Sequence, residues 1–310
     1  MLAEKQKYKI GPEKFPLPVS SPEKQGVPSE HLLHFLEDLD NCKEIGAHSL
    51  IVLRHGTVIL HADWKPYSGV YPHMMYSLSK SITGMAVGLA IAEGLFELED
   101  RIIEFFPEKL PLIRNPRINN LRIKHLLTMT SGIKFNEMGS LTERDWVRAF
   151  FQSECAFEPG SKFAYNSMNS YLLSALVCKK TGLSLVEYLT PRLFEPLGIG
   201  PVFWEKCPLG IEKGGWGLYL RPIEMAKLGQ LFLQKGAWNV NGHMQQILPQ
   251  SWVEQSVNME IPAKMGQYDA HYGYQLWSFP IDGAFQFNGA FGQYVIVLPH
   301  TDMVIAMTGG

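Results

Sequence analysis

Residues 76–92 read YSLSKSITGMAVGLAIA, in which a short polar start leads into the most apolar segment of the chain. Ser77 and Lys80 lie one helical turn apart, so on a helix their side chains project from the same face. Apolar residues then occupy every side of the next turns, which predicts a helix buried on all sides. The apolar run 82–96 has about fifteen residues and contains Glu93, so it is too short to span a bilayer. A lysine in the first turn of such a helix is costly to bury unless it has a chemical role.

The pattern Ser-x-x-Lys begins at three positions, Ser21, Ser77 and Ser131, and physical context separates them. Ser21 precedes a proline in a polar arm, and Ser131 precedes a glycine at the end of a predicted helix. Only Ser77 stands at the start of a helix, where free N–H groups favour an anionic intermediate. Burial there would lower the pKa of Lys80 and let it take the serine proton. The alternative, in which Ser77 only caps the helix and Lys80 reaches the surface, stays open at this point.

The composition excludes several classes of function. The 310 residues include 28 Lys and Arg against 30 Asp and Glu, which leaves a formal net charge of −2. Binding of nucleic acid needs a concentrated basic surface, so we do not expect nucleic acid as the main partner. Hydrophobic residues make up 46% of the chain, which is too high for a disordered protein. The four cysteines are scattered and no metal-ligand spacing or nucleotide motif is present, so we expect no metal and no cofactor.

The ends and the hydrophobic runs of the chain bear on its location. The N-terminal residues contain no apolar core of a signal peptide, and no run reaches the roughly 20 residues of a membrane span. We therefore expect a cytoplasmic protein without a membrane partner. The sequence leaves the oligomeric state open.

The order of predicted elements indicates the fold class. A helix over 29–40 and a hairpin over 48–63 come first, mostly helical segments fill 100–198, and strands return after 270. This order predicts an α+β fold: an antiparallel sheet flanked by helices, with an inserted all-helical domain. We expect the sheet domain to comprise 1–83 and 205–310, and the helical domain 84–204. Asn288-Gly289 predicts a hairpin turn. The late strands are predicted at 272–279, 284–287, 294–298 and 303–307.

The segment 76–84 resembles the nucleophile segment of the serine β-lactamase-related family, which includes class C β-lactamases, D-Ala-D-Ala carboxypeptidases and esterases. Further blocks resemble those of the family in the same order, so the resemblance spans about residues 20 to 310; these blocks are 93–100, 123–132, 158–169, 216–229 and 289–293. The resemblance implies the β-lactamase/transpeptidase-like fold. It also implies a serine hydrolase that acts on a small ester, amide or peptide-like substrate through an acyl-enzyme.

The resemblance also implies catalytic roles. Ser77 would be the nucleophile, and Lys80 would share its proton. Tyr165 would be the second base, with a pKa lowered by the lysine, and would pass the proton to the leaving group. The backbone N–H groups of Ser77 and Ala290 would form the oxyanion hole.

Two departures from the family pattern bear on the substrate. The usual Tyr-x-Asn reads Tyr165-Asn166-Ser167, so Asn166, Ser167 or Asn169 would replace the missing amide. The usual Lys-Thr-Gly or its histidine variant reads Phe287-Asn288-Gly289, which has no cation. An uncharged ester or amide is therefore favoured over an anionic β-lactam or a D-Ala-D-Ala terminus. The expected substrate-binding residues are Ser167, Asn169, Asn288 and Gly289. Five aromatic residues near these blocks would line an apolar pocket; they are Trp216, Tyr219, Tyr272, Tyr274 and Trp277.

Two further expectations remain. The lost cation keeps a second function open, that of a penicillin-binding or sensor-type protein that is acylated without turnover. Relatives usually continue past the strand at 303–307 into a helix that packs beside the N-terminal helix. We therefore expect a truncated chain with one face of that strand partly uncovered, or another segment or subunit that covers this face.

Overall fold

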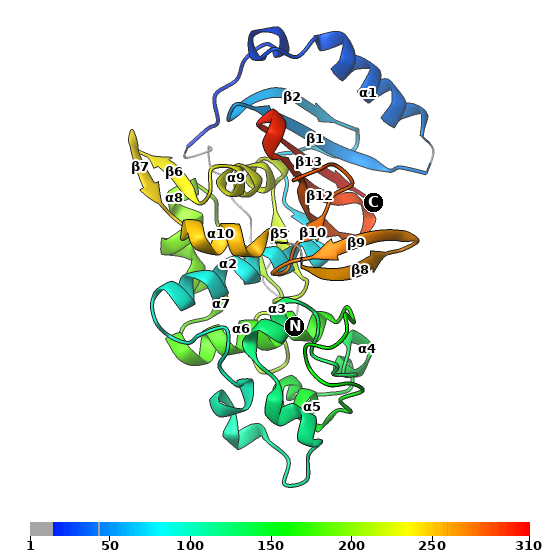
Figure 1. The fold of residues 1–310 in the computed structure, drawn as a ribbon. Helices are drawn as coiled ribbons and strands as arrows, with labels where there is room; N and C mark the ends of the chain where they lie inside the picture. Colours follow the sequence, from blue (N-terminus) through cyan, green and yellow to red (C-terminus); the bar gives the residue numbers. More distant parts are fainter. Residues whose placement is uncertain (1–14, 43, 259) are drawn as a thin grey trace, which may run out of the picture.

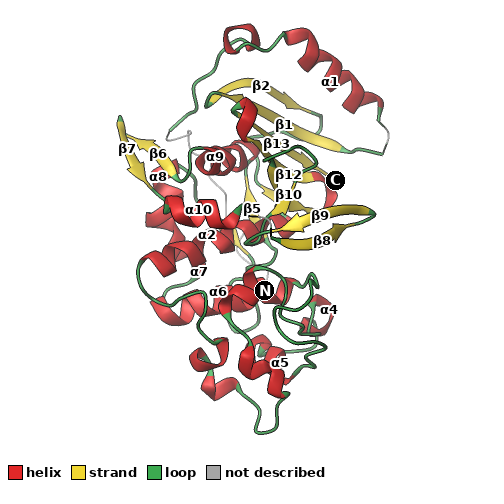
Figure 2. Ribbon diagram, viewed as in Figure 1, coloured by secondary structure: helices red, strands yellow, loops and turns green. Residues whose placement is uncertain are grey.

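The computed structural model describes residues 15–42, 44–258 and 260–310. The strands gather in one half of the molecule, and helices and loops make up the opposite end (Figures 1 and 2). The polar arm that contains Ser21 is described from Phe15 onward, and residues 1–14 lie outside the described residues.

The half of the molecule that holds the strands is built on an antiparallel eight-stranded sheet with the order β2-β1-β13-β12-β11-β10-β9-β8. Strands β3, β5 and β4 form a second small sheet, and β6 pairs with β7. This architecture confirms the predicted α+β class with an antiparallel sheet. The strands are β1 (Ala47–Arg54), β2 (Thr57–Asp63), β3 (His73–Met74), β4 (Phe203–Trp204), β5 (Leu218–Leu220), β6 (Ala237–Val240), β7 (His243–Gln246), β8 (Ile261–Met265), β9 (Tyr268–Tyr272), β10 (Trp277–Ser278), β11 (Phe285–Gly289), β12 (Gln293–Leu298) and β13 (Met303–Gly309).

The helices lie on both faces of the large sheet and form the opposite end of the molecule (Figure 1). They are α1 (Ser29–Asn41), α2 (Ser79–Ala92), α3 (Ile123–Leu127), α4 (Glu137–Ser140), α5 (Trp146–Gln152), α6 (Ser167–Thr181), α7 (Leu185–Leu189), α8 (Glu195–Leu197), α9 (Pro222–Leu233) and α10 (Gln250–Ser256). Short 3-10 or π turns are η1 (Pro22–Gln25), η2 (Tyr76–Leu78), η3 (Ile102–Phe105), η4 (Pro107–Lys109), η5 (Pro116–Asn120), η6 (Thr190–Phe194), η7 (Ala290–Gly292) and η8 (Pro299–Thr301).

The last strand, β13, lies inside the sheet between β1 and β12, and its side chains alternate between two environments. Val304 and Ala306 are fully buried in the main core, on the face that α9 covers. Met303, Ile305 and Met307 are half-buried on the opposite face, in a cluster that includes leucines of α1. The predicted core strand is therefore confirmed, and its second face is only partly covered.

Helix α2 is buried from Ser79 to Ala90, as its all-round apolar sequence predicts. Among the described residues, no helix combines the length and the apolar character that a membrane crossing requires. The helix packs against α6 and beneath the indole of Trp252, which covers Gly88 so closely that a Cβ atom there would collide with the ring. Close packing on all sides therefore fixes the position of its first turn.

The hairpin predicted from Asn288-Gly289 is confirmed, because β11 pairs antiparallel with β12, but the turn was predicted at the wrong residues. Both residues lie within β11 and pair with Tyr294 and Gln293, and the chain reverses only in η7. Gly289 has an extended φ of −129°, so the turn does not use its conformational freedom. The absence of a side chain instead lets the backbone at Gly289 lie close to Met75, because a Cβ atom there would collide with the carbonyl oxygen of Met75.

The single strand predicted at 272–279 is also wrong, because the chain breaks into β9 and β10 at this point. Gln275 adopts a left-handed φ of 64°, and its backbone N–H donates to Leu127 instead of to a neighbouring strand. Strand β8 was not predicted. It completes a hairpin with β9 at the edge of the sheet.

Gly88→Ala is expected to lower the free energy of unfolding by about 1–3 kcal/mol, because the new methyl group overlaps the ring of Trp252. Gly84→Ala, one turn earlier on α2, is the matched control, since a Cβ atom there would lie 3.3 Å from its nearest neighbour, the carbonyl oxygen of Tyr274. Both variants gain the same helix propensity of about 1 kcal/mol. Urea unfolding followed by circular dichroism measures the difference, and equal stabilities of the two variants would contradict the packing described.

Candidate active site

Ser77 lies in the 3-10 turn η2, which leads directly into α2. The turn is anchored by the N–H of Met75, which donates to the carbonyl of Leu218 on β5 at 2.8 Å. Tyr76 adopts a left-handed φ of 46°, an uncommon conformation for a residue with a large side chain. This anchored, strained turn leaves Ser77 half-buried at the N-terminal end of the buried helix.

Lys80 is almost completely buried, with 1% of its surface exposed. Its Nζ atom lies 2.9 Å from Ser77 Oγ and donates to the carbonyl oxygen of Gly215 at 2.7 Å. Burial lowers the pKa of Lys80 to about 7, although the negative charge of Glu137 acts in the opposite direction. The alternative in which Lys80 reaches the surface is therefore wrong, and the neutral amine is well populated near pH 7.

The carbonyl of Gly215 is a partner that the sequence analysis missed. Gly214 and Gly215 lie against α6, where Cβ atoms would approach the carbonyl oxygens of Ser170 and Ser167 to 2.6 Å. Thr83, one turn after Lys80, donates to the carbonyl of Gly214 at 2.8 Å. Because these two glycines lack side chains, a loop 135 residues later in the sequence can approach the first turn of α2.

Tyr165 lies directly before Asn166, the N-cap residue of α6. Asn166 caps α6 by accepting from the N–H of Met168 at 2.9 Å, and Ala164 N–H donates to Met129 at 2.8 Å. These contacts hold the segment so that Lys80 Nζ lies 4.9 Å from the centroid of the Tyr165 ring.

Aromatic residues of β9 and β10 contact the ring of Tyr165, which remains 41% exposed. Trp277 stacks on it at 5.7 Å with an interplanar angle of 28°, and Tyr272 meets it edge-on at 6.3 Å. Two of the aromatic residues that the sequence analysis singled out therefore surround the candidate site.

The prediction that the lysine lowers the pKa of Tyr165 is wrong. The pKa of this phenol is raised because burial around its hydroxyl outweighs the hydrogen bond with Ser77, which acts to lower it. A lysine with a pKa of about 7 carries only part of a charge at neutral pH, so it stabilises a phenolate weakly. In this structure Lys80 is the stronger candidate base, and Tyr165 holds its proton.

Strand β11 ends beside the nucleophile turn. A Cβ atom on Gly289 would lie 3.2 Å from the backbone nitrogen of Leu78, so Gly289 contributes a close approach rather than a side-chain contact with substrate. Ala290 follows directly at the start of η7 and is exposed. The rings of Tyr76 and Phe291 lie 5.0 Å apart and link the two turns. The backbone that carries the predicted oxyanion-hole donors is therefore brought together.

The positions of Ser167 and Asn169 do not support the predicted contact with substrate. Ser167 is buried beneath Gly215, and Asn169 is completely buried. The Asn169 amide is already engaged, because its oxygen accepts from Ser131 at 2.7 Å and its nitrogen donates to Met129 Sδ at 3.5 Å. Asn166, the other candidate, caps α6 and donates to two backbone carbonyls.

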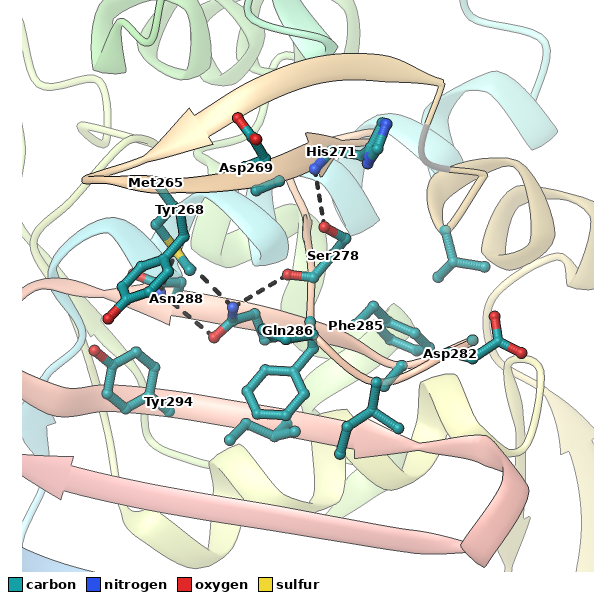
Figure 3. Close-up of a pocket in the computed structure, with 18 of the residues that line it drawn as sticks. Met265, Tyr268, Asp269, His271, Ser278, Asp282, Phe285, Gln286, Asn288 and Tyr294 are labelled. Atoms are coloured by element: carbon teal, nitrogen blue, oxygen red, sulfur yellow. Dashed lines mark hydrogen bonds between the residues drawn. The ribbon is translucent and has the colours of Figure 1, made fainter.

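Asn288 lines a groove between strands of the large sheet (Figure 3). The groove has a volume of about 970 Å³ and is bounded by the β8–β9 hairpin and by strands β11 and β12. The amide of Asn288 donates to Met265 Sδ at 3.4 Å, and neither Ser77 nor Tyr165 lines this space. Phe287, where the family pattern has a cation, is fully buried against Phe232 at 5.1 Å.

Glu137 is a second residue that the sequence analysis missed. It is exposed in the first turn of α4, and its charge raises the pKa of both Lys80 and Tyr165. The neighbouring backbone is fixed, because Phe135 accepts from the Asn166 amide at 2.8 Å. No ion-pair partner of Glu137 is found within residues 15–42, 44–258 and 260–310. Glu137 lies far from Ser77 in the sequence, so no local sequence pattern predicts that its charge acts on Lys80 and Tyr165.

Comparisons with known proteins agree with this geometry. The family model described as Beta-lactamase matches residues 36–308. A β-lactamase of Escherichia coli is 30% identical over 144 residues, 46% of this chain and 37% of that protein. The 6-aminohexanoate-dimer hydrolase of Paenarthrobacter ureafaciens is 25% identical over 242 residues, 71% of this chain and 59% of that protein. The chain thus spans less than two thirds of either relative.

A solved structure shows the same fold. The octameric penicillin-binding protein homologue from Pyrococcus abyssi matches with a TM-score of 0.73, covering 91% of this chain and 73% of that chain. The identity of 19% makes this a likeness of fold alone. It confirms the β-lactamase/transpeptidase-like architecture that the sequence predicts.

Lys80→Met is expected to stabilise the protein at neutral pH and to lose this advantage as the pH rises. The pKa of Lys80 is about 7 in the folded protein against 10.5 for an ordinary lysine. Between these values the unfolded chain binds more protons, so wild-type stability rises with pH, whereas methionine removes this dependence. At 1.36 kcal/mol per pKa unit, the stability difference between variant and wild type should fall by about 3 kcal/mol from pH 6.5 to 9.5. Urea unfolding at both pH values tests this, and a pH-independent difference would contradict the burial argument.

Proposed function

The chain belongs to the Beta-lactamase family, and on this premise we propose that it is a serine hydrolase that cleaves an ester or amide bond through an acyl-enzyme on Ser77. The observation that carries the proposal is the 2.9 Å contact between Ser77 Oγ and the buried amine of Lys80. A serine hydroxyl is a weak nucleophile until a neighbouring base takes its proton. A buried lysine with a pKa of about 7 is such a base, because a substantial part of its amine is neutral near pH 7.

In the proposed acylation step, Lys80 accepts the hydroxyl proton while Ser77 Oγ attacks the substrate carbonyl carbon. The N–H groups of Ser77 and Ala290 hold the resulting oxyanion. Tyr165 donates its phenolic proton to the leaving oxygen or nitrogen, and the proton on Lys80 then restores the phenol. Because the pKa of Tyr165 is raised, its proton is retained until a strongly basic leaving group forms. A water molecule then hydrolyses the ester on Ser77, with the proton transfers reversed.

The charges around the site favour a substrate without an anionic group. Phe287 stands where β-lactamases and carboxypeptidases carry a cation, and Glu137 adds a negative charge whose field reaches Lys80 and Tyr165. A carboxylate on the substrate would meet repulsion here instead of a salt bridge. We therefore propose an uncharged ester or amide as the substrate. The names of the relatives, a β-lactamase and a 6-aminohexanoate-dimer hydrolase, support hydrolysis as the reaction class.

Ser77→Ala is expected to abolish labelling by a fluorophosphonate probe and to reduce turnover of a p-nitrophenyl ester to the background rate, because the only proposed nucleophile is removed. Ser21→Ala and Ser131→Ala, the serines of the other two Ser-x-x-Lys patterns, are the matched controls. Both controls should be labelled like the wild type. Labelling that survives in Ser77→Ala would refute the assignment.

The same assay separates turnover from simple acylation. Steady release of p-nitrophenol beyond one equivalent supports a hydrolase. A single burst of one equivalent would instead favour the second function, an acylated penicillin-binding or sensor-type protein. A parallel panel of a neutral ester, a neutral amide and an anionic β-lactam then tests the charge argument.

Glu137→Gln is expected to move the acid limb of the kcat/KM profile for a neutral ester to lower pH. The charge of Glu137 raises the pKa of Lys80, so its removal keeps the lysine neutral to lower pH. Glu143→Gln, at another exposed carboxylate of the same region, is the control and should leave the profile unchanged. Coincident profiles for Glu137→Gln and the wild type would show that neutral Lys80 is not the form that limits activity.

A further inference from the structure

A buried amide holds the turn that follows Gly289. Gln293 is 1% exposed, and its Nε2 atom lies 3.3 Å from the carbonyl oxygen of Ala290 and 3.0 Å from that of Phe291. The same nitrogen donates to the carbonyl of Gly309 at 2.8 Å. One side chain therefore ties two of the three peptide carbonyls of η7 to the end of β13, inside the sheet.

The turn needs such a tie because its backbone is strained. Phe291 has a left-handed φ of 62°, which a residue with a Cβ atom adopts at a cost. Phe291 is also 64% exposed, so burial of its ring does not secure this conformation. Hydrogen bonds from Gln293 to the carbonyls on both sides of the Phe291 Cα atom fix the two peptide planes that define its φ and ψ.

The stability of the fold does not explain why residue 293 is a glutamine. Its Oε1 atom is buried without a hydrogen-bond partner among the described residues, which is unfavourable. A methionine of similar size would fill the space without this cost. The amide is therefore best explained by the hydrogen bonds with which its nitrogen holds the η7 turn.

We propose that Gln293 is a positioning residue, which orients the η7 turn so that the Ala290 N–H faces the oxyanion that forms at Ser77. The inference rests on the proposed function. Donors of an oxyanion hole contribute through being fixed before the reaction, so a turn free to relax would lose part of the rate. Gln293 does this from behind the turn, through the carbonyl groups, and does not touch the substrate.

Gln293→Met tests the proposal, with Gln286→Met as the matched control. Gln286 is also buried, on β11, but its amide donates to Ser278 and Met265 and not to η7. We expect Gln293→Met to lower kcat for a neutral ester by about 10- to 100-fold with KM changed by less than about threefold. Gln286→Met should keep kcat within about threefold of the wild type.

The decisive measurement is the ratio of kcat/KM for an ester to that for its thionoester. Sulfur accepts hydrogen bonds weakly, so an intact oxyanion hole favours the oxygen substrate. Gln293→Met should lower this ratio by about tenfold, and Gln286→Met should not change it. Because both substrates are measured on one sample, the fraction of folded enzyme cancels, and partial misfolding of Gln293→Met leaves the test valid.

A ratio unchanged in Gln293→Met, or lowered equally in both variants, would overturn the proposal. If neither variant nor wild type showed turnover that depends on Ser77, the proposed function itself would be refuted instead. The wild type and Ser77→Ala, assayed beside the glutamine variants, distinguish these two failures.

Discussion

Removal of the Lys80 amine from water is the constraint on which the rest of the site depends. A charged ammonium is unfavourable in the core, and among the described residues only Ser77 Oγ and the carbonyl of Gly215 lie at hydrogen-bond distance from it. Burial therefore shifts the pKa of Lys80 to about 7, which makes it a candidate base. The all-round apolar sequence of α2 makes this burial possible, because the helix is buried on every side from Ser79 to Ala90.

Four segments far apart in the chain meet around Ser77 and Lys80. Helix α2 brings Lys80, the loop before β5 brings Gly215, the segment before α6 brings Tyr165, and the end of β11 brings Gly289. Glycine permits two of these approaches, since a side chain at either position would strike a neighbouring backbone. The site thus lies where the sheet meets the helices of the other half (Figure 1).

One physical cause underlies the different roles that we propose for Lys80 and Tyr165. Burial disfavours the charged form of each, so it lowers the pKa of the Lys80 amine and raises that of the Tyr165 phenol. Near pH 7 the amine is then partly neutral and able to accept a proton, and the phenol keeps the proton that we propose it donates. The residue types follow from the motifs, but this division of roles depends on how deeply each atom is buried.

The sequence by itself determined the Ser77–Lys80 pair, the buried helix, the core strand that became β13 and the order of strands and helices. These follow from local periodicity and spacing, which act within one or two turns of chain. Only the tertiary structure decided the pKa of Tyr165, the partner carbonyl of Gly215, the field of Glu137 and the burial of Asn169. It also reassigned Gly289 from a turn to a close contact with Met75. Each of these depends on atoms that lie far apart in the sequence, and folding alone brings them together.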